Sequence, residues 1–109
     1  MDTMTESLVI AWTVANQAAD HLKHSHHIVR ILPNGVTGLE AFDNGSDFPA
    51  IRILMGAATT TIQLVPTFGG QATDVVVSDN NDTYTEGCPL ADLDVDFIVH
   101  VFCRHQVQF

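Results

Sequence analysis

Residues 50–78 read AIRILMGAATTTIQLVPTFGGQATDVVVS, and this stretch indicates the fold class. Three runs rich in β-branched and apolar residues lie within it, at 50–55, 58–65 and 73–78. Such runs are typical of β-strands. Gly56 marks a break or bulge after the first run, and residues 66–71 carry the Pro and Gly of a turn before the last one. We therefore expect neighbouring strands of a mostly antiparallel sheet.

Further strands are expected on both sides of this stretch. Residues 26–32 are β-branched and apolar, and the turn signal Pro33-Asn34-Gly35 follows, which predicts a hairpin with residues 36–42. Residues 79–94 are rich in Asp, Asn, Gly, Pro and Thr, which predicts a long loop. Residues 95–104, VDFIVHVFCR, are apolar on both faces of an extended chain and predict a final, central strand.

The N-terminal segment predicts a helix that ends near His24. Thr3 and Glu6 have the spacing of a capping box, in which each side chain bonds an unpaired amide of the first turn. One apolar stripe follows at helical spacing, formed by Leu8, Trp12, Ala15, Ala19 and Leu22 and widened by Val9, Ile10 and Val14.

Together these elements predict a single α+β domain over residues 1–109. The expected architecture is an N-terminal amphipathic helix packed on a five- to six-stranded, mostly antiparallel sheet. A small β-barrel plugged by the helix is the alternative.

The charge balance excludes several kinds of partner. The chain has 13 acidic and 4 basic residues, with a formal charge of −9. The basic side chains are Lys23, Arg30, Arg52 and Arg104. They are too few and too scattered to neutralise phosphates, so we expect neither direct nucleic-acid binding nor attachment to an anionic membrane.

The first apolar run, residues 8–15, decides the expected location. It is too short to span a bilayer, and the flank before it carries Asp2 and Glu6 instead of the basic residues of a signal peptide. We therefore expect a cytoplasmic protein. The apolar content of the chain and the edges of its sheet also favour a homodimer.

An acidic chain suits a partner protein with a basic surface. The residues expected to form the contact are acids of the predicted loop and its neighbour, with one tyrosine: Asp79, Asp82, Tyr84, Glu86, Asp92, Asp94 and Asp96. The acids would speed encounter and fix orientation, and the tyrosine would supply buried contact. The expected class is a non-catalytic protein that binds and blocks or neutralises a partner, as phage anti-defence inhibitors and immunity proteins do. The alternative is that the charge serves only solubility or a salt-rich habitat.

A metal site is the second hypothesis. Four histidines lie within seven residues, at His21, His24, His26 and His27. Neutral imidazole binds zinc and other divalent transition metals, which are the cofactors such a cluster predicts. The segment lacks the spacing of established zinc motifs. The alternative is therefore a helix C-terminus that tolerates histidine, followed by a strand.

Catalysis and small-ligand binding rank below these hypotheses. Cys88 lies in an acidic segment that would raise its pKa, and Cys103 is expected in the core, so neither has the setting of a nucleophile. Nucleotide-binding loops and nucleophile elbows are absent from the sequence, which favours a protein that is not an enzyme. A pocket between helix and sheet, lined by Trp12 and Phe102, is the further alternative for a small-ligand-binding protein.

Overall fold

The computed structural model describes residues 3–24, 28–32, 48–55 and 58–107. The elements in chain order are α1 (Thr3–Leu22), β1 (Ile28–Leu32), β2 (Ala50–Met55), β3 (Ala58–Thr67), the 3₁₀ turn η2 (Phe68–Gly70), β4 (Ala72–Ser78), β5 (Thr83–Pro89), the 3₁₀ turn η3 (Leu90–Asp92) and α2 (Val95–Val107). The predicted class, α+β with a helix on an antiparallel sheet, is confirmed.

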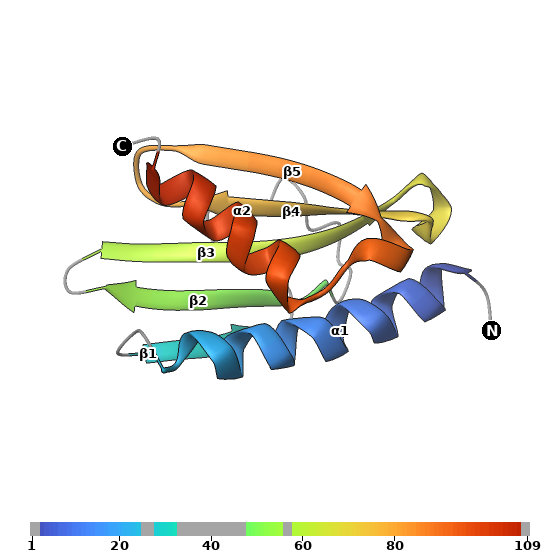
Figure 1. Cartoon of the computed structure of the whole chain (residues 1–109), viewed down its shortest axis with the longest axis horizontal. Coiled ribbons are helices and arrows are strands. Elements are labelled where there is room, and N and C mark those ends of the chain that lie inside the picture. Colours follow the sequence, from blue (N-terminus) through green and yellow to red (C-terminus); the bar gives the residue numbers. More distant parts are fainter. Residues whose placement is uncertain (1–2, 25–27, 33–47, 56–57, 108–109) are drawn as a thin grey trace.

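The strands form one open antiparallel sheet in the order β1-β2-β3-β4-β5. Both helices lie on the same face of it (Figure 1): α1 contacts β1, β2 and β3, and α2 contacts β4 and β5. The register fixes which side chains meet, for example Ile51 with Ile62 and Ile62 with Val77. The described strands do not confirm the alternative barrel.

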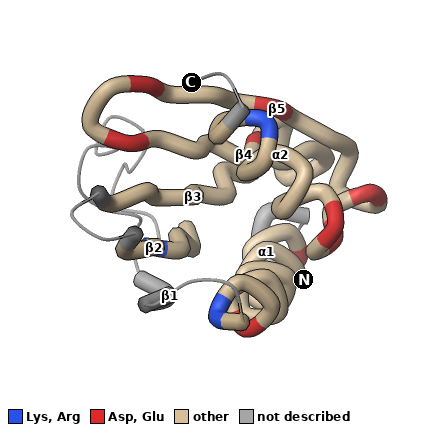
Figure 2. Tube along the Cα trace, turned by 60° about the vertical axis from the view of Figure 1, so that its left-hand side comes forward, with Lys and Arg blue, Asp and Glu red and all other residues tan. Residues whose placement is uncertain are grey.

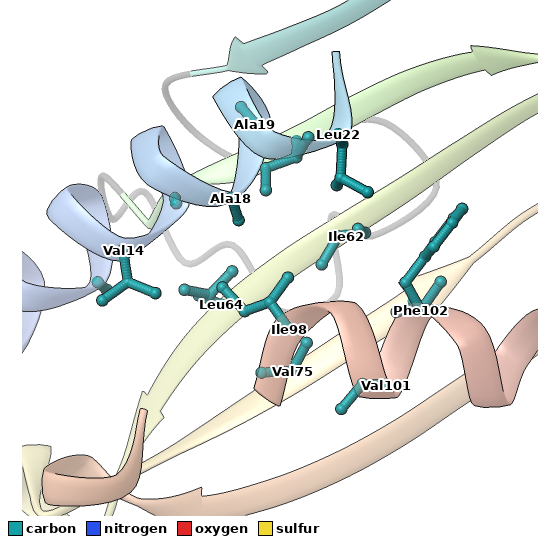
Figure 3. Close-up of a cluster of buried hydrophobic side chains, with 14 of the residues drawn as sticks. Val14, Ala18, Ala19, Leu22, Ile62, Leu64, Val75, Ile98, Val101 and Phe102 are labelled. Atoms are coloured by element: carbon teal, nitrogen blue, oxygen red, sulfur yellow. The ribbon is translucent and has the colours of Figure 1, made fainter. Parts of the chain in front are cut away.

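The hydrophobic core lies between the helices and the sheet. Figure 3 shows side chains of both helices and of β3 and β4 pointing toward one another. Ile62, Leu64 and Val75 on the sheet are fully buried, as is Ile98 on α2. Both layers are thus held by one continuous apolar cluster, which fixes the position of α2 over the last two strands.

Helix α1 packs through small side chains. Its buried face is formed by Ser7, Ala11, Val14, Ala15, Ala18, Ala19 and Leu22. Small residues let a helix approach the sheet closely, so the buried face is centred on alanines instead of on the larger residues of the predicted stripe. Trp12 is only half-buried, and Val9 and Ile10 are exposed. Neither described helix is long and apolar enough to cross a membrane.

Helix α2 occupies the segment that was expected to be the final strand, and that prediction is wrong. Ile98, Val101, Phe102 and His105 are all buried, and they recur at the spacing of one helix face. Asp94 caps this helix, because its Oδ1 accepts a hydrogen bond of 2.8 Å from the Phe97 amide. The cap and the 3.6-residue period outweigh the strand propensity of the valines and phenylalanines.

The predicted long loop 79–94 is also wrong over most of its length. It contains strand β5 and the turn η3. The turn into β5 is built by Asp79, whose Oδ1 accepts hydrogen bonds from the amides of Asn81 (2.8 Å) and Asp82 (2.9 Å). The side chains of β5 then alternate between exposed and half-buried, as expected of an edge strand with one face on the core.

The predicted N-terminal hairpin is only partly tested. Strand β1 lies within the predicted segment 26–32, and it pairs with β2, placing Ile28 opposite Leu54. The expected turn at 33–35 and second strand at 36–42, like Gly56, lie outside the described residues.

Candidate functional site: an acidic half with an open groove

Negative charge is concentrated in the second part of the described chain. Residues 72–107 contain seven acidic residues and a single Arg or Lys, Arg104. The described residues before them contain two acids and three basic residues. Figure 2 shows the resulting separation, with acidic segments along the β4–β5 hairpin and around the start of α2. The β4–β5–α2 unit, called here the acidic half, is therefore the part of the molecule that would attract a basic surface.

An open groove of about 420 Å³ lies where this half meets the turn between β3 and β4. It is lined by Phe68, Gln71, Ala72, Asp74, Gly87, Cys88 and Pro89. The lining is mostly apolar, with one carboxylate. A mostly apolar concavity that holds a few polar groups is the usual form of a binding site.

Phe68 stands at this groove in an unusual conformation. Its φ is +50°, in the left-handed region that non-glycine residues rarely adopt, and Gly69 and Gly70 continue with φ of +67° and +92°. The residue is 83% exposed. Burial therefore does not explain why a phenylalanine occupies this position. An exposed aromatic side chain in a costly backbone conformation is a feature of recognition sites.

Asp74 supplies the carboxylate of the groove. It lies on β4 directly opposite Gly87 on β5. A Cβ atom at Gly87 would lie 2.6 Å from Oδ1 of Asp74, so the carboxylate occupies the space that any other residue at position 87 would fill. The hydrogen bonds and ion pairs found among the described residues do not use Asp74. Among the residues that the structure describes, this carboxylate thus has no polar partner.

The thiol of Cys88 reports the electrostatics of the groove. Burial raises its pKa, and the carboxylates of Asp92, Asp94 and Asp74 raise it further. The thiol is therefore protonated at neutral pH, as the sequence predicts for this acidic segment. One of these carboxylates, Asp74, also lines the groove, so the half-buried Cys88 lies in an acidic part of the groove wall.

A polar network links β5 to α2 in the middle of the acidic half. The Tyr84 hydroxyl donates a hydrogen bond of 3.0 Å to Oε2 of Glu86. The same oxygen lies 3.3 Å from Nε2 of His100. Tyr84 is half-buried and packs against the core, so it contributes to the fold. Glu86 is engaged within the molecule and is less available to a partner than an isolated acid.

The turn between β4 and β5, at the end of the hairpin away from the groove, is tied to the end of α2. His105 is fully buried. Its Nδ1 lies 3.0 Å from the side-chain Nε2 of Gln106, and its Nε2 lies 3.5 Å from Oδ2 of Asp79. Hydrogen bonds from the amides of Asn81 and Asp82 lower the pKa of Asp79, and His105 adds to this effect. Asp79 therefore joins the hairpin turn to the end of α2.

The structure divides the predicted contact residues into three groups. Asp79 and Asp94 are used for a turn and a helix cap, and Tyr84 and Glu86 form the network with His100. Asp82, Asp92 and Asp96 are exposed. Asp82 lies at one end of β5 and Asp92 beyond the other end, about 20 Å away at the usual rise of a strand. The seven residues therefore share one half of the molecule but do not form one compact patch.

The histidine cluster remains untested as a metal site. His21 and His24 are exposed at the end of α1, where Nδ1 of His24 lies 3.0 Å from the Asp20 carbonyl oxygen. His26 and His27 lie outside the described residues. Among the residues that the structure describes, no group of three His, Cys, Asp or Glu side chains is arranged to hold a metal ion.

Cys103, Phe102 and Trp12 were also considered as candidate residues from the sequence. Cys103 is exposed on α2 and is not part of the core, because the segment is a helix and its buried face lies elsewhere. Phe102 is buried within the core cluster, and Trp12 is half-buried. The groove described above lies at neither of these two residues.

Three groove residues were missed from the sequence: Phe68, Asp74 and Gly87. The signal available was the string Thr67-Phe68-Gly69-Gly70, which places an aromatic residue inside a glycine-rich turn. The pairing of Asp74 with Gly87 depends on the register of β5, a strand that the sequence did not predict.

Comparisons with protein-family models, with curated proteins and with solved structures found no match to the chain. Its function is therefore inferred from the geometry.

Proposed function

We propose that this protein is a small, acidic, non-catalytic binding protein that occupies, and so blocks or neutralises, a basic surface of a partner protein. The observation that carries the proposal is the charge separation. Seven acids and one arginine lie in residues 72–107, and the ion pairs of carboxylates in this segment are made with His100 and His105 instead of Lys or Arg. Uncompensated carboxylates on one half of a molecule favour association with a basic surface.

The structure alters the contact surface that the sequence suggests. Asp92 is exposed and its carboxylate acts on Cys88 in the groove wall, and Asp96 is exposed in the first turn of α2. Asp94 and Asp79 instead stabilise the fold. We therefore place the contact at the groove end of the acidic half, with Asp92 and Asp96 as its outer acids.

The test is affinity capture with matched charge reversals. The wild-type protein is compared with Asp92→Lys/Asp96→Lys and with Glu6→Lys/Asp20→Lys, in which both changes lie on exposed positions of α1. Asp96 and Glu6 both lie in the first turn of their helix, so the cost to each helix is similar. A partner retained by Glu6→Lys/Asp20→Lys and lost from Asp92→Lys/Asp96→Lys supports the proposal. Equal capture by both variants contradicts it.

The metal-binding alternative is not favoured by any contact among the described residues, and it is tested separately by metal content. Homodimer formation likewise stays a prediction, for which sedimentation equilibrium is the measurement.

A further inference from the structure

We propose that the groove binds one arginine side chain of a protein partner, with Asp74 as the ion-pair acceptor and Phe68 as the stacking surface. This inference rests on the proposed function and names the group that the acidic half recognises. It is carried by the shape of the groove, its single carboxylate, and the exposed aromatic ring beside it.

The carboxylate is placed for an incoming donor. Asp74 lines the groove, and its carboxylate fits there because Gly87, directly opposite, has no side chain. The ion pairs of the acidic half do not use Asp74. A carboxylate at an apolar surface gains most from a donor that is itself charged, because charge-assisted hydrogen bonds are stronger than neutral ones.

The aromatic ring selects the kind of cation. Phe68 is 83% exposed, so a face of its ring is open to a ligand. A guanidinium is planar and weakly hydrated, and it can stack on an aromatic face while its N–H groups bond a carboxylate. An ammonium is a compact, strongly hydrated point charge that cannot combine these two contacts as well. The combination of Phe68 and Asp74 therefore favours arginine over lysine.

The sign of the surrounding charge agrees with this occupant. Asp92 and Asp94 act on Cys88 in the groove wall in addition to Asp74. An anionic ligand would be repelled by all three carboxylates, and an uncharged ligand would leave Asp74 without a partner. Charge complementarity thus commits the groove to a cation.

The test uses the tripeptide acetyl-Gly-Arg-Gly-amide as the probe. The ¹⁵N-labelled full chain is titrated with it, and the amide shifts are followed by NMR. The control peptide carries citrulline, the neutral analogue of arginine. We expect saturable shifts in residues 68–74 and 86–89 with the arginine peptide only. Equal shifts with the citrulline peptide, or shifts confined to other parts of the chain, would overturn the inference.

Three variants refine the test. Asp74→Asn should lower the affinity for the arginine peptide about tenfold. Asp82→Asn removes the same charge from the far end of β5, and it should change this affinity by less than about twofold. Gly87→Ala keeps every charge but displaces the Asp74 carboxylate, and it should also weaken binding. The dispersion of the amide spectrum verifies that each variant is folded. Equal effects of Asp74→Asn and Asp82→Asn would show general charge attraction and would contradict the arginine site.

The failure of this inference is distinguishable from that of the proposed function. If a partner is captured in the charge-dependent manner above but neither Asp74→Asn nor Phe68→Ala affects it, the groove inference is wrong and the proposed function stands. If the tripeptide binds the groove but no partner depends on the acids, the groove inference stands and the proposed function is wrong.

Discussion

The two ends of the β4–β5 hairpin carry similar side chains and use them differently. At the turn end, Asp79 accepts two backbone hydrogen bonds and contacts the buried His105. At the groove end, Asp74 lies across Gly87 in an open groove, beside an exposed Phe68 in a strained conformation. Acidic composition alone therefore does not define a binding surface. An acid must also be left unused by the fold.

The largest expected effect is on the turn end. Asp79→Ala removes two hydrogen bonds to the backbone and the contact with His105, and we expect the free energy of unfolding to fall by about 2 kcal/mol. The midpoint of thermal unfolding should fall by roughly 10 °C. Urea and thermal denaturation followed by circular dichroism measure this loss. Asp82→Ala is the control, because that side chain is exposed, and a loss as large as that of Asp79→Ala would contradict the division between the two ends.

Asp79 at the turn end should also make the free energy of unfolding depend on pH. Hydrogen bonds from Asn81 and Asp82 lower the pKa of Asp79 below its ordinary value of 3.8. A lowered carboxyl pKa contributes stability that is complete above the ordinary value and is lost as the pH falls through the folded value. The free energy of unfolding of the wild type should therefore exceed that of Asp79→Asn at neutral pH, and the difference should shrink below about pH 4. Urea titrations at a series of pH values measure this difference, and a pH-independent difference would argue against the assignment.

At the groove end, a substitution should raise the free energy of unfolding instead of lowering it. Phe68→Asn places a residue that tolerates the left-handed region at φ +50°, with little packing to lose, so we expect the free energy of unfolding to rise by about 1 kcal/mol. The same variant should lose binding of the arginine tripeptide. Thermal denaturation and the NMR titration measure the two effects. Lower stability in this variant would show that Phe68 is needed for the fold instead of for recognition.

The smallest expected effect is on the reactivity of Cys88. The carboxylates of Asp92 and Asp74 contribute to its raised pKa, so removing either should lower that pKa and increase the fraction of reactive thiolate. In a Cys103→Ser background, Asp74→Asn and Asp92→Asn should each speed alkylation by iodoacetamide at mildly alkaline pH. The rates are measured by mass spectrometry. Asp82→Asn should leave the rate unchanged, and equal acceleration by all three variants would point to net charge instead of the local field.

The sequence predicted the middle of the fold well. The runs at 50–55, 58–65 and 73–78 are strands β2, β3 and β4 to within two residues, because their β-branched residues face a buried sheet. The N-terminal helix was also predicted, although its buried face is centred on Ala11, Ala15 and Ala18.

The last third of the chain was predicted poorly, for two physical reasons. The segment VDFIVHVFCR has strand-forming residues, but its capping Asp94 and its helical spacing decide the outcome. Strand β5 is polar because it lies at the sheet edge, and an edge strand resembles a loop in composition.

The same two errors hid the candidate site. The acids at 92 and 94 were expected in a loop and Asp96 in the strand after it. They instead lie in the turn η3, at the cap of α2 and in its first turn. The groove depends on the cross-strand pairing of Asp74 with Gly87. A pairing of this kind becomes visible only when the register of both strands is known.

We propose that the groove end of the acidic half binds a basic partner. The most direct measurement is the dissociation constant of the captured partner for the wild type, Asp74→Asn and Asp82→Asn, each at low and high salt. We predict that binding weakens with salt for all three proteins, that Asp74→Asn binds about tenfold more weakly than the wild type, and that Asp82→Asn stays within about twofold of it. Salt-independent binding, or equal losses in the two variants, would contradict binding of a basic partner at the groove.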